Sequence, residues 1–271
     1  MDNVSDIINK ESALTERIKA AGKLAVAFSG GTDSTYLVYK AHEVLGDNAL
    51  AVTIRSQVLT GEDFEWTVNF CQDNGIKQVV IDCDVFESEQ FEDNPPDRCY
   101  YCKKMDFEAI LKTAKEHGIE MVADGSNVDD TGDYRPGMIA LEELGIISPL
   151  KEAGLTKSDI RQLSKEAGLP TWDKPAAACL ASRFAYGEKI TTEGLVRVAN
   201  AEKFIRDLGF KGIRVRVHGG LARIEVAPED MERFLGNADE VTGKLKSLGF
   251  TYVTMDLKGY RTGSMNEVLD E

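Results

Sequence analysis

The sequence is poor in several features that whole classes of protein require. Its 271 residues contain no apolar run approaching the roughly 20 residues that a membrane-spanning helix needs, so no membrane partner is expected. Residues 1–22 carry acids from the second position and lack an apolar signal core, which predicts a cytoplasmic protein. Basic residues are also in deficit, because 46 Asp and Glu outnumber 32 Lys and Arg and give a net charge of −14. That charge argues against a nucleic-acid partner but leaves room for a local basic pocket.

Cysteine and histidine are scarce as well. The chain has five cysteines and three histidines, and a small, odd number of cysteines in a reducing compartment does not suggest a disulfide framework. Cys99 and Cys102 form a C-x-x-C pair, which there is typical of metal binding or redox chemistry. A structural zinc site prefers four nitrogen or sulfur ligands, and the sequence has no second C-x-x-C or C-x-x-H. Zinc is therefore the weaker interpretation of this pair.

Short apolar runs alternate with amphipathic segments through the first two thirds of the chain. The runs occupy residues 24–28, 49–54, 78–82, 121–125 and 145–150. This alternation predicts an α/β fold in which helices cover both faces of a parallel sheet. Ligands of such folds bind beyond the carboxyl ends of the strands, so the chemistry is expected in the loops after these runs.

The pattern changes after about residue 186. Helical spacing covers residues 191–209 and 228–249, a hairpin pattern covers 212–227, and a last strand pattern covers 252–257. We therefore predict two domains, residues 1–185 and 186–271, the second a small α+β domain with an antiparallel sheet. The His218–Gly220 turn is expected to supply the positive φ angles that a tight hairpin needs.

The segment Ser29–Ser34, with the sequence SGGTDS, joins the first apolar run to a helical pattern. A strand, a glycine-rich turn and a helix N-terminus form an anion site, because the first helical N–H groups lack intrahelical partners and the helix dipole favours negative charge. The spacing matches neither the Walker motif nor G-x-G-x-x-G. It resembles the PP-loop of the ATP pyrophosphatase superfamily, whose members cleave ATP between the α and β phosphates and adenylylate a substrate. A Ser/Gly-rich cap that binds nothing is the alternative.

That resemblance implies roles for the loop residues. The implied pyrophosphate ligands are Ser29, Gly30, Gly31, Asp33 and Ser34. Asp33 would also help to place Mg²⁺, a hard cation that prefers oxygen ligands. By the same resemblance, backbone groups near Thr53 and Arg55 would meet the adenine of ATP.

Other polar residues follow later runs. They are Asp124, Gly125, Ser126 and Asn127, with Asp129 and Asp130 beyond them, and Arg135 before a proline. The carboxylates could hold the metal that faces the phosphates, or they could cap a helix and form an acidic turn. Arg135 could meet the adenylate or pyrophosphate, or it could serve only the start of a helix.

The cysteines divide into two groups. Cys71 lies in a helical pattern and Cys83 follows a buried run, and both are interpreted as packing residues. Cys99, Cys102 and Cys179 occupy loop or helix-start positions where the active cleft is expected. Three thiolates suit an iron–sulfur cluster that leaves one iron without a protein ligand, and such an iron can carry an extra sulfide.

Several motifs together resemble the LarE family over nearly the whole chain. They are the PP-loop, PDRCYYCKK, DGSNVDDTGDYRPG, ISPL, LTKSDIRQLSKEAGLPTWDKPAAACLASR and RVRVHGGLARIEV. The family makes the nickel-pincer nucleotide cofactor of lactate racemase by converting the carboxylates of pyridinium-3,5-biscarboxylic acid mononucleotide into thiocarboxylates. ATP first adenylylates a carboxylate, and sulfur then displaces AMP.

The resemblance also implies two possible sulfur sources. Some members sacrifice the sulfur of one cysteine at the position of Cys179, whereas others add the C-x-x-C pair and bind a [4Fe-4S] cluster that hands on a further sulfide. Because this chain has all three cysteines, we predict the cluster type, with Cys99, Cys102 and Cys179 as ligands. Sacrifice of Cys179 alone is the alternative.

Arg214 and Arg216 alternate along a predicted strand and should project from one face. Two guanidiniums there can bind a phosphate bidentately, although a solvated strand face is the alternative. By resemblance, Ser182, Arg214 and Arg216 bind the phosphate of the mononucleotide substrate, with Glu202 and Glu225 as weaker candidates nearby. The resemblance further implies a homo-oligomer with contacts in the small domain.

Three other functions compete with this interpretation. A PP-loop tRNA thiolase would share the cysteines, but the acidic charge argues against RNA. An amide-forming synthetase would use nitrogen and would not need three cysteines in the cleft. A nucleotide sensor would bind ATP without substrate-dependent release of pyrophosphate.

Overall fold

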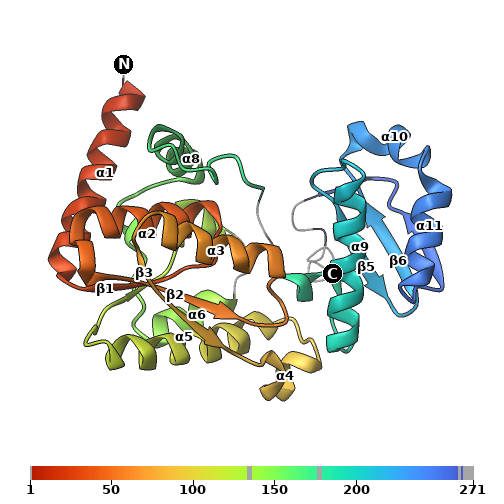
Figure 1. The fold of residues 1–271 in the computed structure, drawn as a ribbon, viewed down its shortest axis with the longest axis horizontal. Helices are drawn as coiled ribbons and strands as arrows, with labels where there is room; N and C mark the ends of the chain where they lie inside the picture. Colours follow the sequence, from red (N-terminus) through yellow and green to blue (C-terminus); the bar gives the residue numbers. More distant parts are fainter. Residues whose placement is uncertain (1, 133–135, 176–178, 262–263, 265–271) are drawn as a thin grey trace. The chain divides into compact units, whose positions relative to one another are not determined.

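The computed structural model describes residues 2–132, 136–175, 179–261 and 264, and it divides the chain into two compact units. The first unit comprises Met1–Asp84 and Asp97–Ala177, and the second comprises Val85–Pro96 and Ala178–Glu271 (Figure 1). The chain therefore visits the second unit briefly before it returns to finish the first.

The first unit contains a four-stranded parallel sheet. Its strands are β1 (Leu24–Ala27), β2 (Ala49–Arg55), β3 (Lys77–Asp82) and β4 (Val122–Ala123), in the order β3-β2-β1-β4. The expected fifth strand at residues 145–150 is wrong, because only Ile147 bridges to Ala123. Pro149 has no N–H to continue the ladder and instead begins helix α7 (Pro149–Glu152).

Helices cover both faces of this sheet, as the alternation of apolar runs predicts (Figure 1). One face packs against α1 (Asp2–Ala21), α2 (Thr32–Leu45), α3 (Gly61–Asp73) and α8 (Lys157–Glu166), and the other against α5 (Arg98–Glu116) and α6 (Pro136–Glu143). Successive residues of β1 face opposite sides, since Leu24 and Val26 belong to the first core and Ala25 to the second. The predicted α/β class with a parallel sheet is thus confirmed.

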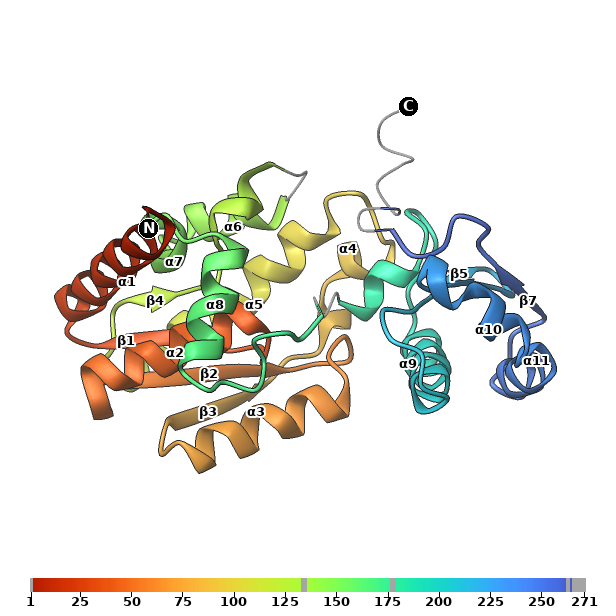
Figure 2. The ribbon, with the colours of Figure 1, turned by 90° about the horizontal axis from the view of Figure 1, so that it is seen from above.

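The second unit contains a three-stranded sheet in the order β5-β6-β7, formed by β5 (Arg214–His218), β6 (Leu221–Glu225) and β7 (Tyr252–Met255). The two longer helices described in this unit are α9 (Thr192–Asp207) and α11 (Ala238–Ser247), and both lie on one side of the strands (Figure 2). The β5–β6 hairpin is antiparallel, and of the two glycines in its turn only Gly219 has a positive φ, of 59°.

The expectation of a purely antiparallel sheet in this unit is wrong. β7 pairs with β6 in parallel, with Leu221 opposite Tyr252 and Ile224 opposite Met255. The chain leaves β6, passes through α10 (Met231–Leu235) and α11, and so re-enters the sheet in the direction of β6. A helical crossover of this kind is what joins parallel neighbours.

The remaining elements are short. They are α4 (Glu89–Glu92) and the 3-10 turns Gly46–Asn48, Val85–Glu87, Val128–Gly132, Leu180–Arg183 and Pro228–Asp230. Across the part of the chain that the structure describes, none of the helices combines the length and the apolar character needed to cross a lipid bilayer.

Candidate active site

The phosphate loop lies between the carboxyl end of β1 and the first turn of α2. Gly30 has a φ of 73°, a left-handed angle that favours glycine, and Gly31 is the extended N-cap residue of α2. Because Gly31 has no side chain to cap the helix, the first N–H groups of α2 are suited to an external anion. The hydroxyl oxygens of Ser29 and Ser34 lie 3.1 Å apart, so the two predicted serine ligands converge on the loop.

Two glycines allow neighbouring segments to approach this loop closely. A Cβ atom at Gly30 would lie 2.9 Å from Cγ2 of Thr67 on α3. A Cβ atom at Gly125, which follows β4, would lie 3.0 Å from the backbone nitrogen of Ser34. The structure therefore brings the segment after β4 directly against the loop. This agrees with the expectation that the loops after the parallel strands meet at the carboxyl edge of the sheet.

Asp33 stands in the first turn of α2 and has two different carboxylate oxygens. Oδ2 accepts hydrogen bonds from Nζ of Lys157 at 2.7 Å and from Nδ2 of Asn127 at 3.3 Å. Oδ1 is buried and has no hydrogen-bond partner among the residues that the structure describes. Burial raises the pKa of Asp33, and the ammonium of Lys157 opposes that rise. An unpartnered carboxylate oxygen in this position fits a hard cation such as Mg²⁺.

The other acidic candidates already accept hydrogen bonds. Asp124 is buried and accepts from the hydroxyl of Ser126 and from that of Ser148, the latter at 2.6 Å. Asp129 accepts from the backbone N–H of Lys157 at 2.8 Å, and Asp130 from that of Asn127 at 2.9 Å. Within the described ranges no group of three or more His, Cys, Asp or Glu side chains could hold a metal ion.

The residues predicted near adenine differ in exposure. Thr53 is fully buried, and its hydroxyl donates to the carbonyl of Phe28 at 2.9 Å, so its side chain joins β2 to the end of β1. Arg55 is exposed at the end of β2, is paired with Asp82 on β3, and lies 5.2 Å from the ring centre of Phe64. Arg135 lies outside the described residues.

Two lysines that the sequence patterns do not single out contact the loop. Besides Lys157 at Asp33, Lys174 donates to the carbonyl of Gly30 at 3.1 Å and to Oδ1 of Asp63 at 2.9 Å. Both lysines follow the 145–150 run, so their segments could have been assigned to the same edge of the sheet. Neither lysine belongs to the S-G-G-x-D-S motif itself.

The cysteine pair begins α5. Cys99 is exposed and Cys102 half-buried, and their spacing of three residues places them on one side of the helix. The Sγ atom of Cys102 lies 3.9 Å from Oδ2 of Asp106, a half-buried residue whose carboxyl pKa is raised to about 6 by partial burial. Two cysteines on one side of a helix could supply two of the three predicted cluster ligands.

The remaining cysteines lie elsewhere. Cys179 is exposed, belongs to the second unit and precedes the Leu180–Arg183 turn. Cys71 is buried in α3, and this burial raises the pKa of its thiol to about 12, which agrees with a packing role. Cys83 is half-buried after β3.

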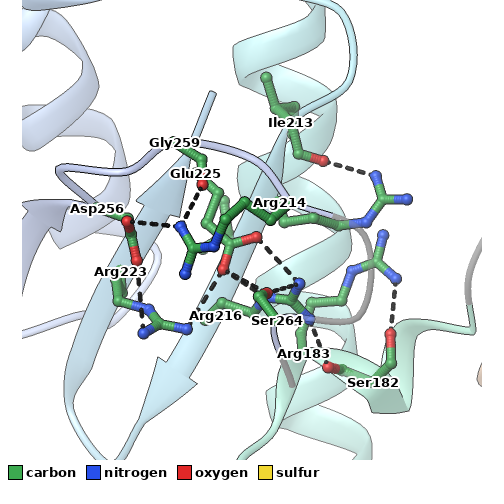
Figure 3. Close-up of polar contacts among 12 residues, drawn as sticks. Ser182, Arg183, Ile213, Arg214, Arg216, Arg223, Glu225, Asp256, Gly259 and Ser264 are labelled. Carbon is green, nitrogen blue, oxygen red and sulfur yellow. Dashed lines mark hydrogen bonds and ion pairs between the residues drawn. The ribbon is translucent and has the colours of Figure 1, made fainter. Parts of the chain in front are cut away.

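In the second unit, β5 carries Arg214 and Arg216 into a cluster of polar side chains (Figure 3). Arg216 donates from Nε and Nη2 to the two carboxylate oxygens of Glu225, at 3.0 Å each. It also donates to the backbone carbonyl of Ser182 at 2.8 Å and to the hydroxyl of Ser264 at 2.9 Å. Arg216 and Glu225 thus form a buried, bidentate ion pair.

A second buried pair lies beside the first. Arg183 donates from Nε and Nη2 to Glu202, at 2.9 Å each. It also donates from Nη1 to the hydroxyl of Ser182 at 3.1 Å (Figure 3). Arg214 donates to the carbonyl of Ile213 at 2.7 Å, and burial together with the charge of Arg183 lowers its pKa. The structure therefore brings the predicted Ser182, Arg214 and Arg216 together in one cluster.

Among the residues that the structure describes, positive charge exceeds negative charge in this arginine cluster. Its five guanidiniums are those of Arg183, Arg214, Arg216, Arg223 and Arg261, and its three carboxylates are those of Glu202, Glu225 and Asp256. Such a local basic site in a chain with a net charge of −14 is suited to a small anionic ligand.

Comparison with known proteins finds relatives along nearly the whole chain. An uncharacterised protein of Synechocystis is 43% identical over 246 residues, which are 90% of this chain and 92% of the relative. The pyridinium-3,5-bisthiocarboxylic acid mononucleotide synthase of Lactiplantibacillus plantarum is 39% identical over 267 residues, 98% of this chain and 97% of the relative. No family model matches the chain.

A more distant relative matches part of the chain. It is a subunit of the glutamine-hydrolysing GMP synthase of Thermoplasma volcanium, 28% identical over 169 residues, which are 57% of this chain and 54% of that protein. This similarity agrees with the parallel sheet and phosphate loop of the first unit and supports a PP-loop ATP pyrophosphatase fold.

Proposed function

The chain belongs to the LarE family of ATP-dependent sulfur transferases, and we propose that it converts the carboxylates of pyridinium-3,5-biscarboxylic acid mononucleotide into thiocarboxylates. The observation that carries this proposal is the 39% identity, over 98% of the chain, to a protein named as a synthase of the bisthiocarboxylic acid mononucleotide. The phosphate loop and the arginine cluster support it from two separate parts of the chain.

The first proposed step activates a substrate carboxylate. A carboxylate oxygen attacks the α-phosphorus of ATP, the bond from that phosphorus to the oxygen bridging the β-phosphate breaks, and pyrophosphate leaves. The N-terminus of α2 would bind the pyrophosphate through its N–H groups, together with Ser29, Gly30, Gly31, Asp33 and Ser34. Asp33 would hold Mg²⁺, which offsets phosphate charge when bound, through its unpartnered Oδ1.

The second proposed step transfers sulfur. A sulfur nucleophile attacks the carbonyl carbon of the acyl adenylate, and AMP leaves with the electron pair of the broken bond. Cys99, Cys102 and Cys179 would hold a [4Fe-4S] cluster, whose chemistry when bound is to present an iron that lacks a protein ligand to a sulfide. The placement of Cys99 and Cys102 on one side of α5 supports this assignment. Sacrifice of the sulfur of Cys179 is the alternative source.

The arginine cluster is the proposed site of the substrate phosphate. Ser182, Arg214 and Arg216 would bind it, because their side chains gather where guanidiniums outnumber carboxylates. Glu202 and Glu225 would orient the buried guanidiniums rather than touch the phosphate, since each already accepts a bidentate pair. A homo-oligomer stays a prediction from the family.

The test is an anaerobic preparation assayed for iron and for pyrophosphate. We expect roughly four irons per chain, loss of that iron in Cys99→Ala, and pyrophosphate release only when the pyridinium mononucleotide is added with ATP. Full activity of an iron-free Cys99→Ala variant would rule out the cluster as the sulfur source and favour sacrifice of the Cys179 sulfur. Pyrophosphate release with tRNA but not with the mononucleotide would identify tRNA as the substrate. If no substrate caused pyrophosphate release, the protein would be a nucleotide-binding sensor and not an enzyme of this kind.

A further inference from the structure

The peptide unit between Gly30 and Gly31 decides which way the phosphate loop presents its backbone. The carbonyl of Gly30 and the N–H of Gly31 belong to one planar trans peptide and therefore point in opposite directions. Glycine carries no Cβ, so a Gly–Gly peptide can rotate with little steric hindrance. A rotated peptide would turn a carbonyl oxygen toward a bound phosphate and repel it.

Lys174 holds this carbonyl. Its Nζ donates to the oxygen of Gly30 at 3.1 Å and to Oδ1 of Asp63 at 2.9 Å, and it lies 5.2 Å from the ring centre of Trp66. Asp63 is fixed in turn, because the hydroxyl of Thr60 donates to its other oxygen at 2.7 Å. The side chain of Lys174 is 26% exposed and that of Asp63 25%, so both are largely shielded from water.

The backbone around Lys174 is also attached to the loop. The hydroxyl of Thr32, the first residue of α2, donates to the carbonyl of Thr171 at 2.8 Å. The guanidinium of Arg161 on α8 donates to the carbonyl of Lys174 at 3.3 Å. Lys174 therefore approaches Gly30 from a segment that is itself anchored at both ends of the Thr171–Lys174 turn.

We propose that Lys174 is a positioning residue for the ATP site, whose ammonium holds the Gly30 carbonyl outward so that the Gly31 N–H faces the phosphates. Donation from a charged group also polarises the shared peptide and strengthens its N–H as a donor. This inference rests on the proposed ATP-dependent function. It assigns to Lys174 a role that the loop motif does not contain.

The test uses inorganic pyrophosphate with Mg²⁺ as the probe and titration calorimetry on the full chain. Lys174→Met should weaken pyrophosphate binding by roughly 10- to 100-fold, the effect of losing one hydrogen bond from a charged donor. Lys174→Arg, which restores a charged donor, should bind within about threefold of the native protein. Lys165→Met is the matched control, because Lys165 also lies over a tryptophan, 4.7 Å from the ring centre of Trp172, yet does not contact the loop.

Ionic strength separates positioning from simple attraction of the anion. A hydrogen-bonded positioning effect persists in about 0.5 M salt, whereas the attraction of a nearby charge is screened. Unchanged affinity of Lys174→Met, or a loss that disappears in high salt, overturns the proposal. Should Lys174→Met fail to fold, Lys174→Gln decides, since native affinity without the ammonium equally overturns it. Failure of the native protein to bind pyrophosphate would instead remove the proposed function.

Discussion

Glu225 offers the sharpest test of how the arginine cluster is held together. Its carboxylate is fully buried and accepts two hydrogen bonds of 3.0 Å from Arg216, one of 3.1 Å from Ser264 and one of 3.3 Å from Arg223. Glu225→Leu would leave the guanidinium of Arg216 buried without its counter-charge, and such a loss costs about 3–5 kcal/mol of unfolding free energy. With a urea dependence of about 1–3 kcal/mol per molar, the unfolding midpoint of the second unit should fall by at least about 1 M.

The assay is urea unfolding monitored by circular dichroism. Tryptophan fluorescence would not report on the second unit, because both tryptophans belong to the first unit. The double variant with Arg216→Met should lose far less than the sum of the single variants, since replacing both partners of a buried pair with apolar residues is often nearly neutral. The matched control is Asp207→Asn, which breaks an exposed ion pair with Lys203 in the same unit and should change stability by less than about 1 kcal/mol. A Glu225→Leu loss no larger than that of the control, or additive losses in the double variant, would show that the Arg216–Glu225 pair does not hold the cluster together.

Three further predictions concern the first unit. Gly125→Ala places a Cβ 3.0 Å from the nitrogen of Ser34, so it should lower the unfolding free energy by about 1–3 kcal/mol and weaken pyrophosphate binding; an unchanged urea midpoint would contradict this close approach. Lys157→Met removes the cation that opposes the raised pKa of Asp33. A carboxyl with a raised pKa in the folded state contributes stability that is complete below its unfolded pKa and is lost as pH rises through the folded pKa. The variant should therefore lose more stability than the native protein as pH rises above the ordinary carboxyl pKa, and an identical pH dependence of the urea midpoint in the two proteins would count against it. Cys71, with a pKa of about 12, should resist iodoacetamide at about pH 8 until urea is added, and rapid alkylation of the native protein, seen by mass spectrometry, would refute its buried placement.

Much of the first unit follows from local pattern alone. Four of the five apolar runs form parallel strands, and the S-G-G-x-D-S turn joins β1 to α2 where the phosphate loop is expected. The exception at residues 145–150 arises because hydrophobicity records burial and not pairing. Pro149 is the sequence feature in this run that argues against a strand, because proline cannot donate to a strand ladder.

Features that depend on tertiary partners are not encoded in such patterns. The spacing of helices and strands predicts β7, but not that its crossover makes it parallel to β6. The alternation of Arg214 and Arg216 predicts a shared strand face, but not that Glu225 holds Arg216 bidentately. The contact of Lys174 with the phosphate loop could not be predicted for the same reason, because its partner Gly30 lies 144 positions earlier in the chain.

The most direct test of the proposed function is the mass of the pyridinium mononucleotide after incubation with the anaerobic protein, ATP and Mg²⁺. We expect carboxylate oxygen to be replaced by sulfur, with one AMP and one pyrophosphate formed for each sulfur transferred. A substrate recovered at its original mass, under conditions where the protein is folded and binds ATP, would contradict the proposed sulfur transfer.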